Sequence, residues 1–376
     1  MSEWKKYKIG DVCNTISDTY KGRADYVVLI NTSDVLEGKC LNHTKQPNKN
    51  LKGQFKKTFR KGDILYSEIR PANKRFAYID FESTNYIAST KLMVLRSNEN
   101  ISSKYLYYIL QSPNIVDALQ SLAETRSGTF PQITFSELSH LEIELPNLEQ
   151  QARIVKLAES LDDKIELNRR INENLEQQAQ ALFKHWFVEN PKALEWEQGN
   201  LNDVISIYDH MRKPLSGQER ERMDKIYPYY GAASLMDYVD NYIFDGVYLL
   251  LGEDGTVIDE QGYPILQYVY GKFWVNNHAH ILKGINGFTT ESLYILLKQT
   301  NIRSIVTGAV QPKISQTNLK SVNITIPPQD ILLRYNEIIS PMFGQIRKNN
   351  DEIIKLSQLR DTILPKLMNG EITITE

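Results

Sequence analysis

The chain contains an internal repeat, and this repeat restricts the possible folds more than any other feature of the sequence. A segment that starts at Pro131 reads PQITFSELSHLEIELP, and a segment that starts at Pro312 reads PKISQTNLKSVNITIP. At a constant offset of 181 residues, Ile133 aligns with Ile314, and the closing prolines of the two segments also align. Solenoid units are only about 20–50 residues long. The period therefore predicts two similar domains, each followed by a similar segment.

The composition is that of a folded globular chain with room for two or three domains. Of the 376 residues, 41% are hydrophobic and 24% are charged. No apolar run approaches the roughly 18 residues of a membrane span, and the opening MSEWKK lacks the apolar stretch of a signal peptide. Cys13 and Cys40 match no metal or redox spacing. We therefore expect a protein of the reducing cytoplasm, without a membrane partner.

Residues 1–147 and 191–327 are predicted to form two mixed domains of short strands and helices. The apolar residues of 103–110 follow a helical pattern, and 291–297 repeats that pattern in the second domain. Each domain ends in a segment of alternating apolar and polar residues closed by a proline, which is typical of a half-buried strand.

Two long helices are predicted after the domains, within residues 148–190 and 328–376. Apolar residues recur every seven positions in both segments, which is typical of a coiled coil and predicts helices of about 40 residues, or about 60 Å. The predicted seam of the first helix is Ile154, Leu161, Ile165, Asn168, Leu175 and Leu182. The predicted seam of the second helix is Met342, Ile346, Asn349, Ile353, Leu356 and Ile363.

Asn168 and Asn349 occupy the same seam position in the two repeats. If the helices pair antiparallel, we expect these two residues to meet, because a buried asparagine pair fixes the register of a coiled coil. The alternative is an amphipathic helix on each domain surface. Pro341, Gly344 and Pro365 interrupt the second helix, so we also expect a kink or break near residue 341. The predicted fold class is α+β: two repeated domains separated by an antiparallel coiled coil.

No catalytic motif is evident in the sequence. There is no nucleotide-binding G-x-x-x-x-G-K-[ST] loop, no glycine-rich turn of the methyl-donor type and no Asn/Asp-Pro-Pro-aromatic motif. His278 and His280 flank Ala279 at strand spacing, but no third metal ligand is apparent, so we interpret them as a polar strand end. The chain is predicted to have no catalytic residues, no metal site and no cofactor of its own.

Basic residues cluster with aromatic residues in the first domain. Between residues 45 and 75, ten basic and two acidic residues give a net charge of +8, whereas the whole chain carries −2. Lysine and arginine neutralise DNA phosphates, which supplies most sequence-independent affinity. The predicted phosphate contacts are Lys45, Lys49, Lys52, Lys56, Lys57, Arg60 and Lys61. Because arginine can pair with guanine through two hydrogen bonds, the candidate base contacts are Arg70, Lys74, Arg75 and Arg126.

A second basic and aromatic stretch lies in the second domain. The predicted DNA contacts there are Arg212, Lys213, Tyr227, Tyr229, Tyr230, Gln311 and Lys313. Gln311 and Lys313 flank Pro312 at the turn before the closing strand. Most charge runs are solvated loops, and this remains the alternative for both stretches.

The junctions between domain and helix resemble those of the specificity (S) subunits of type I restriction-modification systems. In the first copy the similar residues are 128–133 (GTFPQI), 150–154 (QQARI) and 161–165 (LDDKI). In the second copy they are 308–314 (GAVQPKI) and 364–372 (LPKLMNGEI), with a one-residue insertion before the proline. The resemblance covers essentially the whole chain in its proper order.

This resemblance implies a non-catalytic subunit that recognises double-stranded DNA. Two target-recognition domains would bind the two halves of a bipartite, asymmetric site, and the helices would hold the domains apart. The helices would also dock two methylation subunits, which carry S-adenosylmethionine and methylate adenine N6. Restriction subunits that use ATP and Mg²⁺ would join this core.

Two other functions remain open at this point. The chain could be a self-contained DNA methyltransferase or restriction enzyme, although the missing motifs oppose this. It could also be a coiled-coil adaptor without DNA contact, although the basic and aromatic stretches oppose that.

Overall fold

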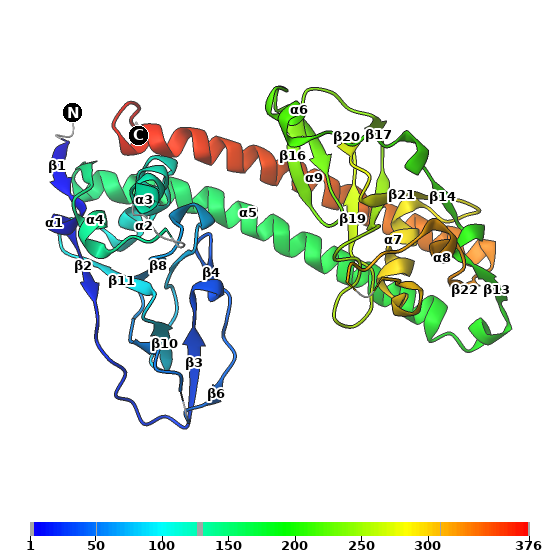
Figure 1. Ribbon diagram of the computed structural model, residues 1–376, viewed down its shortest axis with the longest axis horizontal. Helices are drawn as coiled ribbons and strands as arrows, with labels where there is room; N and C mark the ends of the chain where they lie inside the picture. The colour runs from blue at the N-terminus through cyan, green and yellow to red at the C-terminus, as the bar shows by residue number, and fades with distance from the viewer. Residues whose placement is uncertain (1–3, 50, 126–130, 309, 375–376) are drawn as a thin grey trace. The chain divides into compact units, whose positions relative to one another are not determined.

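A computed structural model of the protein, drawn in Figure 1, describes residues 4–49, 51–125, 131–308 and 310–374. The chain divides into two compact units. The first unit comprises Met1–Ile165 and Ile354–Glu376, and the second comprises Glu166–Ile353. Each unit therefore contains one mixed domain and one half of each long helix.

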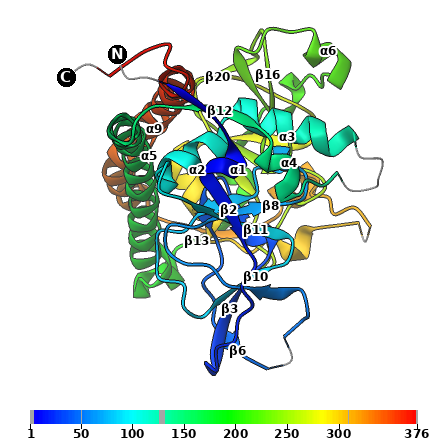
Figure 2. The ribbon, with the colours of Figure 1, turned by 90° about the vertical axis from the view of Figure 1, so that its left-hand side faces the viewer.

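The first domain contains strands β1 to β12 and helices α1 to α4. The strands are β1 (Lys5–Lys8), β2 (Cys13–Ile16), β3 (Tyr26–Ile30), β4 (Val35–Leu36), β5 (Lys39–Cys40), β6 (Gln46–Pro47), β7 (Phe55–Lys57), β8 (Ile64–Ser67), β9 (Phe76–Tyr78), β10 (Tyr86–Ser89), β11 (Leu92–Ser97) and β12 (Glu142–Leu145). The helices are α1 (Ile9–Val12), α2 (Ser103–Gln111), α3 (Pro113–Thr125) and α4 (Phe135–Ser139). Strands β3 and β6 lie side by side at the end of the domain remote from β12 (Figure 2).

The second domain contains strands β13 to β22 and helices α6 to α8. The strands are β13 (Glu197–Asn200), β14 (Ile205–Ile207), β15 (Tyr227–Tyr230), β16 (Leu235–Val239), β17 (Phe244–Asp245), β18 (Tyr248–Gly252), β19 (Leu266–Val269), β20 (Lys272–Val275), β21 (Ala279–Gly284) and β22 (Asn323–Ile326). The helices are α6 (Gly217–Glu221), α7 (Thr290–Lys298) and α8 (Gln316–Lys320).

The two domains have the same sheet topology. One four-stranded sheet has the order β6-β3-β10-β7 in the first domain and β16-β15-β20-β17 in the second. Another has the order β2-β11-β8-β9 in the first and β14-β21-β18-β19 in the second. The parallel pairs, β3 with β10 and β15 with β20, occupy matching positions. The predicted repeat of a mixed domain is therefore confirmed at the level of strand order.

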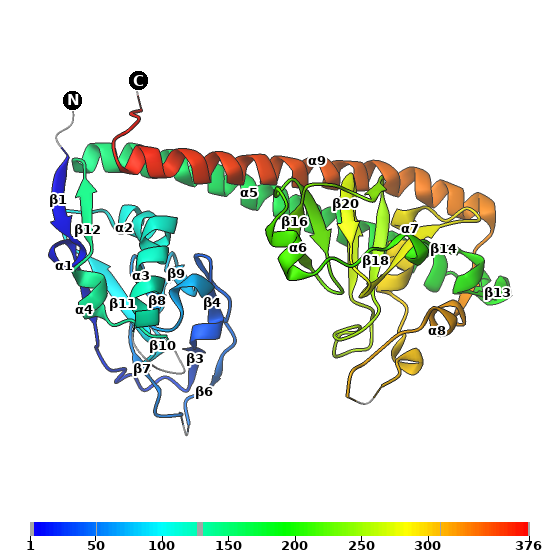
Figure 3. The ribbon, with the colours of Figure 1, turned by 45° about the horizontal axis from the view of Figure 1, so that its top comes forward.

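Apolar strands and capped helices build the core of each domain. Strand β18 is buried along its whole length, as expected for a central strand of apolar residues. Ser102 caps helix α2, because its hydroxyl accepts a hydrogen bond from the Tyr105 amide, and Thr289 caps α7 in the same way through the Ser292 amide. Helix α2 packs on β9 and β11, whereas α7 packs on β18, β19 and β21 (Figure 3).

The two long helices pair antiparallel, as predicted. Helix α5 spans Leu148–Phe183 and continues into a π-helical turn, Lys184–Val188, and helix α9 spans Gln329–Met368. In the first unit the Arg360 guanidinium donates to the Asp162 carboxylate at 2.7 Å. In the second unit the Asn172 side chain donates through Nδ2 to Oδ1 of the Asn350 side chain at 2.7 Å. Within the second unit, Asn168 bonds to Glu352, and the Tyr335 hydroxyl donates to the Ala179 carbonyl oxygen. A later position in α5 therefore faces an earlier position in α9, which is the antiparallel arrangement.

The register of the pair differs from the prediction, although every predicted seam residue is buried or half-buried. Asn168 donates to Glu352 at 2.8 Å, and Asn349 donates to Asn172 at 2.8 Å. The two central asparagines therefore do not bond to each other. Glu352, the partner of Asn168, lies about one helical turn from Asn349. Asn172, the partner of Asn349, lies about one helical turn from Asn168.

Of the kink or break expected near residue 341, a break does not occur, since α9 is continuous from Gln329 to Met368. Pro341 is exposed, whereas its neighbours Ile339 and Phe343 are buried against the second domain. Proline removes one backbone hydrogen bond from a helix. We attribute the continuity of α9 to the burial of these apolar neighbours, which holds both sides of the proline in place.

We expect Asn349→Ala to destabilise the second unit. Asn349 is 4% exposed and bonds to both Asn172 and Gln345, so its loss leaves partners unsatisfied. The expected loss of unfolding free energy is about 1–3 kcal/mol. Urea unfolding followed by circular dichroism measures it, with the exposed neighbour variant Lys348→Ala as control. Equal midpoints for the two variants would contradict the structural role of Asn349.

Candidate nucleic-acid interface

Six of the predicted phosphate contacts are exposed side chains around β6 and β7. They are Lys45, Lys49, Lys52, Lys56, Arg60 and Lys61. No hydrogen bond or ion pair holds any of these side chains among the residues that the structure describes. Ammonium and guanidinium groups that are free in this way are available to bind phosphate.

Lys57 differs from its neighbours because its ammonium group is used inside the domain. Its Nζ atom donates to the carbonyl oxygens of Thr90 at 3.1 Å and Leu92 at 2.8 Å. Burial lowers the pKa of Lys57. Lys57 therefore ties β7 to the turn between β10 and β11 rather than facing solvent.

Arg70 and Lys74 flank a short 3-10 turn, Pro71–Asn73, and both have left-handed backbone conformations. Their φ values are 44° and 51°. Residues other than glycine seldom adopt such values, and the strain persists only where surrounding contacts impose it. Here the Arg70 amide donates to the Pro131 carbonyl oxygen at 3.1 Å, and the Ala72 amide donates to Gln120 Oε1 at 3.0 Å.

The side chains of this turn differ in their availability. Arg70 and Lys74 are exposed, and the Lys74 Nζ atom lies 3.8 Å from the Glu37 carboxylate. In contrast, the Arg75 guanidinium donates to the carbonyl oxygens of Ser33 at 3.1 Å and Val35 at 3.4 Å, so it braces the chain before β4. Arg126 and residues 128–130 lie outside the described residues, as does Ala309 in the second copy.

The segment before the closing strand is anchored in the same way in both domains. The Ile133 amide donates to the Glu68 carbonyl oxygen at 2.8 Å, and the Ile314 amide donates to the Glu253 carbonyl oxygen at 2.9 Å. Gln311 is exposed in the second domain. Lys313 is also exposed, and its Nζ atom lies 3.3 Å from the Glu253 carboxylate.

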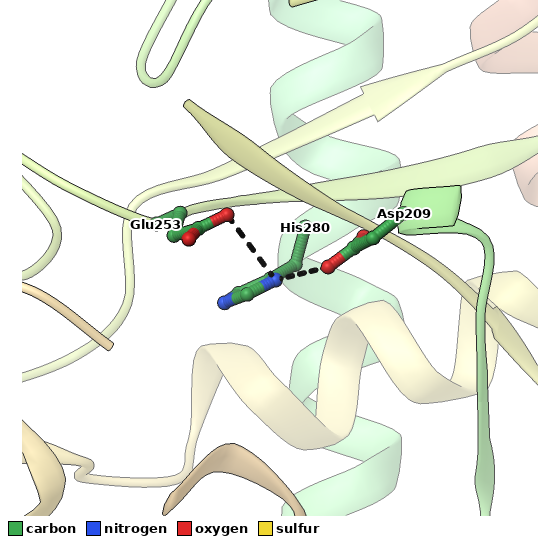
Figure 4. Close-up of side chains that lie close together, drawn as sticks. All are labelled: Asp209, Glu253 and His280. Atoms are coloured by element: carbon green, nitrogen blue, oxygen red, sulfur yellow. Dashed lines mark hydrogen bonds and ion pairs between the residues drawn. The ribbon is translucent and has the colours of Figure 1, made fainter. Parts of the chain in front are cut away.

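Asp209, Glu253 and His280 form a buried polar cluster in the second domain (Figure 4). His280 Nδ1 lies 2.6 Å from Asp209 Oδ2 and 3.8 Å from Glu253 Oε2, and Nε2 lies 2.8 Å from the Ile314 carbonyl oxygen. Both ring nitrogens thus face acceptors.

Arg212 completes this cluster and is not free to contact DNA. Its guanidinium donates to Glu253 Oε2 at 2.7 Å and to the Ala279 carbonyl oxygen at 2.8 Å. Burial alone would raise the pKa of Asp209, but the hydrogen bond and positive charge of His280 outweigh it, so the pKa lies below its usual value of 3.8. The cluster therefore contains ionised, internally paired groups.

Asp209, Glu253 and His280 have donor atoms of the kind that bind metal ions. Their contacts instead favour a network of ion pairs within the protein. Both carboxylates already face positive groups from Arg212, His280 and Lys313. A divalent cation would have to displace the Arg212 and Lys313 side chains from these carboxylates. Sequence reasoning missed Asp209 and Glu253 as partners of His280, because they lie 71 and 27 residues before it.

The tyrosines of β15 face the interior of the second domain to different degrees. Tyr229 is 1% exposed, and its hydroxyl accepts a hydrogen bond from the Leu215 amide at 3.0 Å. Tyr227 and Tyr230 are half-buried and pack against Tyr242 and Phe273. Lys213 is exposed, and its carbonyl oxygen accepts from the Trp274 indole.

Comparison with known proteins shows which family the chain resembles over its length. Residues 1–177 and 193–359 match the type I restriction modification DNA specificity domain. The chain is 30% identical to the type I restriction enzyme HindI specificity subunit of Haemophilus influenzae, over 99% of this chain and 100% of that protein. It is 26% identical to the MjaIX specificity subunit of Methanocaldococcus jannaschii, over 85% of this chain and 79% of that protein. The chain belongs to the type I restriction-modification specificity family.

The fold agrees with this membership. The crystal structure of a type I restriction-modification S subunit from M. genitalium matches with a TM-score of 0.56 at 16% identity, covering 100% of this chain and 97% of that one. As a specificity subunit, the protein is a DNA-recognition component and not an enzyme. Within the described residues, no helix is both long enough and apolar enough to cross a membrane.

We expect Asp209→Asn to destabilise the second unit in a pH-dependent manner. The folded-state pKa of Asp209 is below 3.8, so its ion pairs stabilise the fold above that pH and are lost as the pH falls through the lowered value. Removing one partner of a buried pair typically costs about 3–5 kcal/mol. The difference from the wild type should be greatest near neutral pH and should shrink below about pH 4.

Urea unfolding followed by tryptophan fluorescence measures this difference, because Trp186, Trp196 and Trp274 all lie in the second unit. The matched control is Asp240→Asn, at an exposed aspartate. A difference that stays constant from pH 7 to pH 3 would show that the Asp209 charge does not stabilise the fold.

Proposed function

We propose that each domain reads one half of a bipartite, asymmetric DNA site, and that α5 and α9 set the distance between the halves. The observation that carries this proposal is a pair of domains with one sheet topology and different surface residues. The edge strand β6 is Gln46–Pro47, whereas the matching strand β16, Leu235–Val239, has the sequence LMDYV. Different side chains on one scaffold favour different half-sites.

The exposed basic groups of the first domain support phosphate binding by Lys45, Lys49, Lys52, Lys56, Arg60 and Lys61. Arg70 and Lys74 project from a strained turn, and such turns often occur at binding sites, so these two are the favoured base contacts. Lys57, Arg75, Arg212 and Tyr229 would instead position the surfaces, because their polar groups bond within the protein. In the second domain, Lys213, Tyr227, Tyr230, Gln311 and Lys313 remain the proposed contacts.

The partner proteins are proposed from the same family relationship. Methylation and restriction subunits would assemble with this chain, with two methylation subunits docked on the long helices. Exposed apolar side chains on these helices support docking, since Leu167 and Ile354 are 51% and 54% exposed. S-adenosylmethionine, ATP and Mg²⁺ would bind to the partner subunits, and the complex would act on DNA in the cytoplasm.

Replacing Lys45, Lys49, Lys52 and Lys56 by glutamine should weaken binding to all DNA sequences. Each lost phosphate contact should flatten the plot of log affinity against log salt by about 0.9. Filter binding or fluorescence anisotropy across a salt series measures both quantities. The control replaces four exposed lysines outside this stretch, namely Lys5, Lys8, Lys192 and Lys348. The same affinity and slope in both proteins would show that the stretch is a solvated loop.

Lengthening the helix pair should lengthen the gap between half-sites without altering either half. Seven residues inserted after Ile165 and seven after Ile353 preserve the heptad pattern in both helices. They add about 10 Å of helix, which corresponds to about three base pairs of B-DNA. Sequencing of methylated sites in cells that carry the variant and its methylation subunit measures the gap. An altered half-site with an unchanged gap would refute the proposed spacing role.

A further inference from the structure

A polar groove of ≈ 560 Å³ lies in the first domain beside β3, β6 and β7. Polar side chains make up most of its lining, among them Asn31, Asp34, Gln46, Lys49, Lys52 and Gln54, and they lie beside the apolar Leu29, Pro47, Leu51 and Phe55. Small-molecule pockets are lined mostly by apolar side chains with a few polar groups. The composition of this groove suits a polar partner instead.

The amides in the groove fall into two classes. Asn42 donates to the Leu29 carbonyl oxygen at 2.9 Å and accepts from the Thr44 amide, and Asn31 accepts from the Thr32 amide. These groups hold the backbone of the groove. Gln46 and Gln54 are exposed, and the described residues provide no hydrogen-bond partner for either side chain.

The backbone that carries these two glutamines is well held. Gln46 pairs with Val27 in the antiparallel contact of β6 with β3, and the Gln54 carbonyl oxygen accepts from the Thr90 amide at 2.7 Å. Asn48 Nδ2 donates to the Ala24 carbonyl oxygen at 2.9 Å, which holds the chain just after β6. The backbone that carries the two side-chain amides is already ordered. Binding through these amides therefore costs little backbone conformational entropy.

An amide side chain presents a donor and an acceptor side by side. This pair matches adenine N7 and N6 in the major groove, whereas an ammonium group offers donors only. Lys49 and Lys52 line the same groove and can bind the phosphates that flank such a base. The groove therefore combines positioning contacts with groups suited to reading a base.

We propose that Gln46 and Gln54 are specificity-determining residues that read adenine of A·T pairs in one half-site. This inference rests on the proposed function, in which each domain reads one half. The matching edge strand of the second domain, β16, has no amide side chain. Tyr238, which is 42% exposed, pairs with the second residue of β15 as Gln46 pairs with the second residue of β3. The two domains thus differ in base-reading chemistry at one topological position.

The test uses the full chain with its methylation subunit, and the readout is sequencing of the methylated sites. Gln46→Ala and Gln54→Ala should each relax the preference at one or two A·T positions of a single half-site, by about 5- to 150-fold. The other half-site and the gap should stay as in the wild type. Asn114→Ala changes an exposed amide on α3 of the same domain, outside the groove, and should alter nothing.

Gln46→Glu and Gln54→Glu distinguish a change in base recognition from a loss of folding. Glutamate has the same shape but only accepts hydrogen bonds, so it should shift the preference from adenine towards cytosine, whose N4 donates. Unchanged methylated sites in all four variants would overturn this inference alone. Changes in both half-sites at once would overturn it together with the assignment of one half-site to each domain.

Discussion

The pairing of α5 with α9 completes the hydrophobic core of each unit. In the first unit, Ile154 of α5 and Leu367 of α9 belong to the same hydrophobic cluster as Ile9, so residues from the two ends of the chain are buried together. In the second unit, Phe183 of α5 and Tyr335 of α9 pack with Leu249 of β18. Neither domain can therefore bury its core fully without a segment from each helix.

Polar groups in the helix pair give this arrangement its register. Apolar seams alone tolerate slippage, whereas a buried amide without a partner costs about 1–3 kcal/mol. In the second unit, Asn168 and Asn349 are almost fully buried, and each has a partner on the opposite helix. In the first unit, Asp162 accepts from both Tyr108 of α2 and Arg360 of α9, so the register also ties the pair to its domain.

The sequence was sufficient to predict features that arise from periodicity. The repeat and the two long helices follow from spacing that is independent of side-chain detail. Heptad spacing is the same in parallel and antiparallel pairs, so the antiparallel pairing, although predicted, does not follow from it. The register could not be predicted, because Asn168 and Asn349 each satisfy their amide one turn away from the expected partner. The break expected at Pro341 is absent, because a local propensity was outweighed by the burial of Ile339 and Phe343.

The same limit applies to the candidate interface. A count of basic residues does not distinguish Lys56, which is exposed, from Lys57, whose ammonium group bonds to two carbonyl oxygens. Nor does it reveal that Arg212 is paired with Glu253, a residue 41 positions later in the chain. The choice between a free and a bonded side chain depends on tertiary contacts that no local pattern contains.

The distribution of anchors explains how one fold can serve two different half-sites. The segment before the closing strand is held by backbone atoms in both domains, through the carbonyl oxygens of Glu68 and Glu253. Backbone anchors do not depend on the identity of nearby exposed side chains. Substitution of an exposed residue usually changes stability by less than about 0.5 kcal/mol. Side chains such as Gln46 and Tyr238 can therefore diverge between the domains, and recognition can change while the core and the helix pair remain the same.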